Sequence, residues 1–128
     1  MRTWLIDGNN VFGSRPDGWW NDRDRAAGRL AQRVAEWCRT HEDDVVMVFD
    51  PPVSEATRGL AGGNLAIVEA ARRGRNAADD DLVELAGERF GAGGSAVVVV
   101  TSDRGLIGRL PSGVERMGVG RFRDLIGY

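Results

Sequence analysis

The chain has 128 residues, which leaves room for one compact domain and excludes a second. Hydrophobic residues make up 42% of it, enough for a packed core and too much for a disordered protein. The formal net charge of −2 and the pI near 5.4 exclude a globally basic nucleic-acid binder, so any anion site must be local.

The first half of the chain is predicted to hold two buried strands separated by a helix. Residues 3–6 are an apolar run that ends at the turn formers Asp7-Gly8-Asn9-Asn10, which predicts a strand followed by a loop. Residues 22–40 have helical spacing, with apolar side chains on one stripe and charged ones opposite. Residues 45–49 are a continuous apolar run closed by Asp50 and two prolines, which predicts the second strand.

The second half continues the alternation. Residues 53–64 are predicted to be a loop, and residues 65–71 are either a third strand or a helix, because their alanines suit both. The remaining predictions, in chain order, are a basic turn at 72–76, a helix at 79–90, the strongest strand at 96–101, a short helix from Ser102 to about 110, a strand at 114–117 and a helix at 121–126.

Alternating strands and helices predict one α/β domain over residues 1–128, with a mostly parallel sheet of four or five strands and helices on both faces. In such sheets, functional groups lie beyond the carboxyl ends of the strands, at the switch point in strand order. The chemistry is therefore expected where strands end.

The residue types that are missing exclude several chemistries. All 17 basic residues are arginine, so a Walker-type phosphate loop and a Schiff-base lysine are excluded. Cys38 is the only cysteine and His41 the only histidine, so one chain cannot build a disulfide, a zinc cluster or a Ser-His-Asp triad. If the protein is an enzyme, carboxylates must carry its chemistry.

Four segments place a carboxylate at the predicted edge: Asp7, Asp50, Asp79 and Asp103. A single aspartate there is more often a cap or turn former, and their joint occurrence is what favours a site. Helix phase directs Asp79 toward the sheet, Asp80 to the flank and Asp81 to solvent.

Gathered carboxylates repel, by on the order of 3 kcal/mol for a pair about 5 Å apart at an effective dielectric near 20. Protonation or a cation must offset this repulsion. Oxygen ligands without histidine or cysteine suit Mg²⁺ or Mn²⁺, as one or two ions, and Asn10 can add an amide oxygen or hold the Asp7 loop. Such ions would activate a water and orient a phosphodiester.

Four motifs in order resemble the NYN branch of PIN-like nucleases. They are Asp7-Gly8-Asn9-Asn10-Val11, Val48-Phe49-Asp50, Ala78-Asp79-Asp80-Asp81-Leu82 and Val100-Thr101-Ser102-Asp103-Arg104. The segment at residues 10–20 is similar to the first loop of small single-domain bacterial NYN proteins. The resemblance covers nearly the whole chain, although three consecutive aspartates stand where one or two are expected.

This resemblance implies a Rossmann-like sheet and a divalent-metal site that hydrolyses phosphodiester bonds, usually in RNA. Carried over by position, the catalytic metal ligands would be Asp7, Asp79 and Asp103, with Asp80 as an additional ligand. Asn10 and Asp50 would support the pocket, and Thr101 and Ser102 would orient Asp103 or a bound water.

Several side chains near the same edge are candidates for holding RNA. Arg72, Arg73, Arg75 and Arg104 fall on predicted loops and can bind backbone phosphates, although each one alone suits a solvated turn equally well. Arg23 lies on the apolar stripe of the first helix and either faces the site or pairs elsewhere. Trp19 and Trp20 either stack unpaired bases or anchor their loop on the core.

The leading functional prediction is a metal-dependent ribonuclease that acts on single-stranded or looped RNA, with DNA left open. The alternatives are an RNA-binding module with little catalysis and a toxin-like PIN endonuclease with an inhibitory protein partner. A homodimer stays open. The apolar run at the N-terminus reaches the charge of Asp7 too early for a signal peptide, and the longest apolar run, at 96–100, is far too short to span a membrane. A cytoplasmic protein is therefore predicted.

Overall fold

The structure is a computed structural model, and it describes residues 2–71, 77–91 and 96–128. One sheet of five parallel strands runs through it in the order β3-β2-β1-β4-β5. The strands are β1 (Arg2–Asp7), β2 (Asp44–Phe49), β3 (Leu65–Glu69), β4 (Ala96–Val100) and β5 (Glu115–Met117). The predicted α/β fold with a parallel sheet is confirmed.

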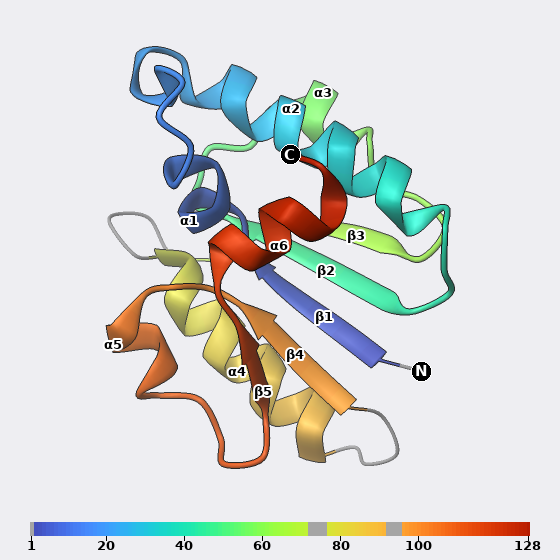
Figure 1. The fold of residues 1–128 in the computed structure, drawn as a ribbon, viewed down its shortest axis with the longest axis vertical. Coiled ribbons are helices and arrows are strands. Elements are labelled where there is room, and N and C mark those ends of the chain that lie inside the picture. Colours follow the sequence, from blue (N-terminus) through green and yellow to red (C-terminus); the bar gives the residue numbers. More distant parts are fainter. Residues whose placement is uncertain (1, 72–76, 92–95) are drawn as a thin grey trace.

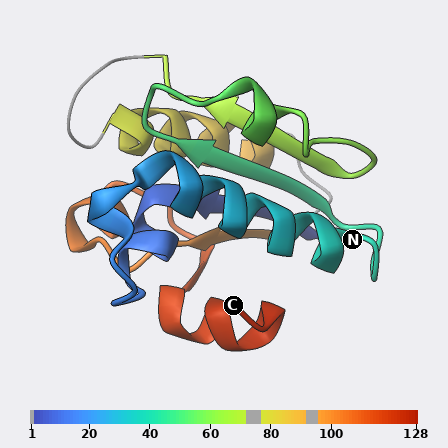
Figure 2. The ribbon, with the colours of Figure 1, turned by 90° about the horizontal axis from the view of Figure 1, so that it is seen from above.

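Helices cover both faces of this sheet (Figures 1 and 2). One face carries α1 (Gly8–Gly13), α2 (Arg23–Cys38) and α6 (Val119–Ile126), and α3 (Glu55–Arg58) packs beside α2. The other face carries α4 (Ala77–Gly91), with α5 (Arg104–Ile107) following β4. A short 3-10 helix, η1 (Trp19–Asn21), lies between α1 and α2.

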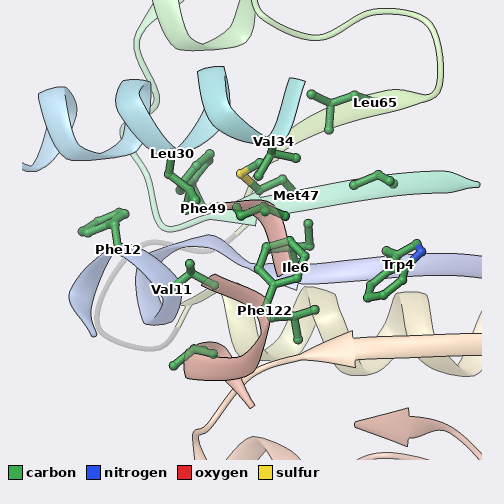
Figure 3. Close-up of a cluster of buried hydrophobic side chains, with 14 of the residues drawn as sticks. Trp4, Ile6, Val11, Phe12, Leu30, Val34, Met47, Phe49, Leu65 and Phe122 are labelled. Carbon is green, nitrogen blue, oxygen red and sulfur yellow. The ribbon is translucent and has the colours of Figure 1, made fainter. Parts of the chain in front are cut away.

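Alternation along the strands divides the core into two layers. Trp4 and Ile6 of β1 point to the side of α1, α2 and α6, where Leu30 and Phe122 meet them (Figure 3). Leu5, between them in sequence, points to the side of α4. Successive side chains of a strand leave opposite faces of the sheet, so apolar runs without polar interruption belong to strands that are covered on both sides.

Two local predictions are wrong. The segment after β1 is the helix α1 and not a loop, because Gly8 lets the chain turn directly under the ring of Phe49, where a Cβ would collide, and Val11 and Phe12 are then buried. The predicted loop at 53–64 contains α3, which Ser54 caps by accepting a hydrogen bond from the Thr57 N–H at 3.2 Å.

The ambiguous segment at 65–71 is the strand β3, which pairs in parallel with β2. The predicted basic turn at 72–76 lies outside the described residues. Within the described ranges, no helix has the length and apolar character that crossing a membrane requires.

The order of the strands creates one switch point. From β1 the chain passes to β2 and β3 on one side, and α4 then carries it back to β4 on the other side of β1. Crossovers that leave two neighbouring strands in opposite directions open a crevice at the carboxyl ends of those strands. Here that crevice lies between β1 and β4, so it begins where Asp7 and Thr101 stand.

Candidate functional site

A cavity of about 430 Å³ opens at this switch point. Four of the residues that line it are aspartates from four segments: Asp7 at the end of β1, Asp50 after β2, Asp79 in the first turn of α4 and Asp103 after β4. Among the described residues that line the cavity, none is basic. The four carboxylates that the sequence places at strand ends are therefore brought together.

Asp7 is the most deeply placed of them, with 4% of its surface exposed. Its Oδ2 accepts a hydrogen bond of 2.9 Å from the Thr101 hydroxyl, across the crevice between β1 and β4. Burial raises the pKa of Asp7 to about 7, against the lowering effect of this hydrogen bond, and the nearby charges of Asp79 and Asp50 raise it further. Among the described residues, no ion pair joins Asp7 to a positive side chain.

Asp79 also has a raised pKa, in a more exposed position than Asp7. Burial raises its pKa to about 6, the charges of Asp103 and Asp50 add to the rise, and Arg109 opposes it. Helix phase correctly predicted that Asp79 turns toward the sheet. Two acids with raised pKa values in one cavity are typical of a functional site, because groups whose pKa values are shifted by burial and by like charges cluster at such sites.

Asp50 and Asp103 combine a place in the cavity with a structural hydrogen bond. Asp50 Oδ1 accepts from the N–H of Ala78 at 2.8 Å and so holds the start of α4, one residue before Asp79. Asp103 Oδ1 accepts from the N–H of Leu106 at 3.1 Å and caps α5. Both capping contacts fix the loops from which these carboxylates reach the cavity.

Two neighbouring amides of α1 hold the loops on either side of β1. Asn9 Oδ1 accepts from the N–H of Asp50 at 2.8 Å, after β2. Asn10 Oδ1 accepts from the N–H of Ser102 at 2.7 Å, after β4. Sequence reasoning predicted Asn10 and missed Asn9, although two asparagines in succession after a strand-end aspartate were a signal for both.

Thr101 and Ser102, to which the resemblance gives supporting roles, make hydrogen bonds at the edge of the cavity. Besides its bond to Asp7, the Thr101 hydroxyl oxygen accepts from the N–H of Asp103 at 3.1 Å, so one buried side chain orders two of the acids. Ser102 Oγ accepts from the N–H of Val119 at 3.0 Å and ties the loop to the start of α6. Thr101 therefore orients Asp103 through its backbone.

The structure does not bring Asp80 into the cavity. Its Oδ1 accepts a hydrogen bond of 2.8 Å from Arg109 Nη2, in a half-exposed ion pair. Asp81 Oδ2 accepts from the N–H of Ala71 at 3.1 Å, away from the cavity. Sequence reasoning missed Arg109, because an ion pair across 29 residues leaves no local signal.

The residues predicted to bind substrate differ in their positions relative to the cavity. Trp19 lines the cavity and packs on Phe12 at 5.7 Å between ring centroids, while Trp20 is 59% exposed. Arg23 lies over the Trp19 ring, 5.5 Å from its centroid, and lines a smaller cleft that shares Asn9 and Asp50 with the cavity.

Arg104 is exposed at the first turn of α5 and does not line the cavity. Arg72, Arg73 and Arg75 lie outside the described residues.

The side-chain oxygens that line the cavity belong to carboxylates, amides and hydroxyls, which are ligands that suit a hard divalent cation. Across residues 2–71, 77–91 and 96–128, no group of three or more acidic, histidine or cysteine side chains is arranged so that it could hold a metal ion by itself. Mg²⁺ commonly binds through one or two carboxylates and completes its shell with water and phosphate oxygens. Burial and the neighbouring carboxylates account for the raised pKa values of Asp7 and Asp79.

No family model matches the sequence, and no curated protein matches it. Among solved structures, Rae1 (YacP) from Bacillus subtilis matches with a TM-score of 0.76 and 21% identity, over 99% of this chain and 74% of that chain. This chain has the fold of Rae1.

More distant structures extend the comparison. A T5 protein co-crystallized with metal ions matches with a TM-score of 0.60 and 11% identity, over 94% of this chain and 55% of that chain. A mutant T5 5′-exonuclease also matches with a TM-score of 0.60, at 14% identity, over 94% of this chain and 51% of that chain. At these identities, the likeness to Rae1 and to the T5 proteins establishes the fold, and function must be argued from the site.

Proposed function

We propose that this protein is a divalent-metal-dependent ribonuclease that hydrolyses phosphodiester bonds in RNA. The observation that carries the proposal is the convergence of Asp7, Asp50, Asp79 and Asp103 on one cavity whose described lining contains no basic residue. The fold agrees with it, since a T5 5′-exonuclease shares the fold. The NYN branch of PIN-like nucleases, which the strand-end motifs resemble, is the family we propose.

In this proposal Asp7, Asp79 and Asp103 hold one or two Mg²⁺ or Mn²⁺ ions, with Asp50 and Asn10 in support. The chemistry that such an ion supplies when bound is activation of a water and neutralisation of charge on the phosphodiester oxygens. The water oxygen forms a bond to phosphorus, the ester P–O bond breaks, and a proton ends on the leaving oxygen. The proposal keeps Asp80 as an additional ligand only if its bond to Arg109 is released.

The chain's own residues position the reaction. Thr101 holds Asp7 by its hydroxyl and Asp103 by its backbone N–H, so two acids keep a fixed separation. Asn9 and Asn10 hold the loops that carry Asp50 and Asp103. Holding ligands and water in place before the substrate arrives is how a site lowers the entropic part of the barrier.

The proposal is tested by incubating a labelled single-stranded RNA with Mn²⁺, Mg²⁺ or a chelator. The purified Asp103→Asn protein is run beside the wild type, so that a contaminating nuclease is recognised. The asparagine keeps the Oδ1 that caps α5, so this variant is expected to fold. Asp81→Asn is the matched control, because Asp81 belongs to the same acidic run as Asp79 and lies outside the cavity.

Metal-dependent cleavage that disappears in Asp103→Asn and persists in Asp81→Asn is the expected result. Absence of cleavage, or equal cleavage by wild type and Asp103→Asn, would contradict it. The RNA-binding module without catalysis would then be the better proposal, and RNA affinity the next quantity to measure.

A further inference from the structure

Two surface hollows continue the acidic cavity across α2. The first, of about 320 Å³, is lined by Trp19, Arg25 and Arg29, and Trp19 also lines the acidic cavity. The second, of about 410 Å³, is lined by Arg29 and by a further set of residues that includes Arg15, Arg33 and Tyr128. The two hollows with their four arginines, Trp19 and Tyr128 are called the arginine groove below.

Shared residues make the path continuous. Trp19 joins the acidic cavity to the first hollow, and Arg29 joins the first hollow to the second. The second hollow lies between α2 and the C-terminal end of α6, which is drawn next to α2 in Figure 1. A flexible polymer bound at the cavity therefore meets this groove as soon as it passes Trp19.

The described lining of the groove also contains three acids, and each of them already has a contact within the protein. Asp17 pairs with Arg15 at 3.4 Å, and Glu36 pairs with Arg33 at 2.9 Å. Asp22 accepts a hydrogen bond from the backbone N–H of Arg25 at 3.0 Å and so caps α2. These contacts leave the guanidinium groups of Arg25 and Arg29 to other anions.

Arg25 and Arg29 are exposed, and in the part of the chain that the structure describes neither has an ion pair. Together with Arg33 they recur every four residues, so they stand about 6 Å apart along one face of α2. This repeat is on the scale of the spacing between neighbouring phosphates in an extended single strand. Guanidinium groups match phosphate oxygens in a forked geometry.

Aromatic rings stand where the groove meets the cavity. Trp19 and Trp20 pack edge to face with 5.9 Å between ring centroids, and Trp20 is 59% exposed. At the far end, the Arg15 guanidinium lies over the Tyr128 ring, 4.8 Å from its centroid. Arginines that follow a backbone, interleaved with rings on which unpaired bases stack, are the usual means of binding single strands.

We propose that the arginine groove binds the backbone of single-stranded RNA on one side of the bond that is cut in the acidic cavity. This inference rests on the proposed function and adds to it the substrate class and the path of the strand. The cavity itself repels phosphates through its carboxylates, so attraction must come from a neighbouring surface. In a chain of net charge −2, the described lining of the groove carries four arginines against three acids, so it is more positive than the cavity beside it.

The test measures binding in a chelator, where metal-dependent cleavage is absent. The probe is a fluorescein-labelled single-stranded oligouridylate of about a dozen nucleotides, titrated by anisotropy at several salt concentrations. The variant is Arg25→Gln with Arg29→Gln, which removes both cations from exposed positions. The matched control is Arg39→Gln, an exposed arginine at the end of α2 that lines a different hollow.

The double variant is expected to lose about tenfold or more in affinity at low salt. The slope of log K against log salt is expected to fall by about 1.4, or about 0.7 for each lost phosphate contact. Arg39→Gln is expected to bind like the wild type, and all three proteins are expected to melt alike. An unchanged affinity and slope in the double variant would overturn the groove, and so would an equal loss in Arg39→Gln.

This outcome is separable from that of the proposed function. Loss of binding by the double variant, with no cleavage by the wild type in Mn²⁺, would support the groove and contradict the nuclease. Metal-dependent cleavage with unchanged binding by the double variant would support the nuclease and overturn the groove. Tighter binding of a duplex than of the single strand would also overturn the groove as a single-strand path.

Discussion

Two hollows of similar size lie at opposite ends of the sheet, and they differ in charge. The hollow at the amino ends, of about 460 Å³, lies between the end of α2 and residues 59–65. Its lining includes one acid and one base, Glu36 and Arg39. The cavity at the carboxyl ends, of about 430 Å³, holds four aspartates and, among its described lining residues, no base.

The difference shows that volume alone does not identify a functional site in this protein. Charges of opposite sign need no ligand, whereas four carboxylates in one cavity raise the free energy of the folded state until a cation or a proton joins them. The hollow at the amino ends is therefore interpreted as structural, and the cavity at the carboxyl ends as functional. Each prediction below tests one side of this contrast.

The largest expected effect separates neighbouring acids of α4. Asp79→Asn is expected to lower the metal-dependent cleavage rate by about 100- to 1,000-fold, as the loss of a group that stabilises transition-state charge does. Asp81→Asn is expected to stay within a few-fold of the wild type, because its carboxylate is bonded to the Ala71 N–H outside the cavity. Rates are compared on the same labelled RNA in Mn²⁺.

Equal loss in both variants would contradict the assignment of Asp79. It would place the ligand at a different position of the acidic run, since three consecutive aspartates leave the register open by one residue.

The second prediction concerns Asp7 and pH. Its pKa is about 7 in the folded protein, against an ordinary value of 3.8, so the unfolded chain releases the proton first as pH rises. The contribution of Asp7 to stability is therefore fully present below pH 3.8, declines between pH 3.8 and 7, and is lost above that. Asp79, with a folded pKa of about 6, acts in the same direction.

Chemical denaturation in a chelator at pH 5 and pH 8 measures this effect. The wild type is expected to be less stable at pH 8, and Asp7→Asn is expected to reduce the difference and to raise the free energy of unfolding at pH 8 by about 1–3 kcal/mol. Cleavage by the same variant is expected to be lost. A wild type equally stable at both pH values would contradict an unpaired charge on Asp7.

The third prediction tests the amino end. Asn64 Nδ2 donates to the carbonyl oxygens of His41 at 3.1 Å and Asp43 at 2.8 Å, so Asn64→Ala leaves both acceptors without this partner. The expected loss of stability is about 1–2 kcal/mol by denaturant titration. The cleavage rate per folded molecule is expected to stay unchanged. A large loss of cleavage without loss of stability would give this end of the sheet a role in the reaction.

The fourth prediction is a modest effect of metal on stability. At pH 8, millimolar Mg²⁺ or Mn²⁺ is expected to stabilise the wild type by about 1 kcal/mol, seen as a rise of a few degrees in Tm, because the ion binds only the folded state. Asp79→Asn is expected to lose this rise, and Asn64→Ala to keep it. Equal melting of the wild type with metal and with chelator would count against a cation site.

Sequence alone predicted the parts of this contrast that depend on local patterns. Apolar runs located the strands, and because parallel strands share a carboxyl edge, Asp7, Asp50 and Asp103 could be placed together. The α-helical period of about 100° per residue placed Asp79 on the side of the helix that faces the cavity, because α4 is a regular α-helix.

Features that depend on distant partners escaped prediction. The sequence of α1 predicts a loop because it is rich in turn formers. Its packing under Phe49 is a tertiary contact, which a local pattern does not reveal. The Asp80–Arg109 pair joins residues far apart in the chain. The same holds for the hydrogen bonds that Asn9 and Asn10 accept from the backbone of Asp50 and Ser102. The arginine groove was missed because each of its arginines, taken singly, looks like an ordinary solvated residue of an amphipathic helix.

The hydrogen bond between Asp7 and Thr101 joins residues 94 positions apart. While the chain is still being synthesised, this hydrogen bond cannot form until β4 has docked beside β1. Asp103, which depends on Thr101 for its position, arrives at the same late stage. Any fragment that stops before β4 therefore lacks the complete set of acids, so the proposed activity requires synthesis at least through Asp103.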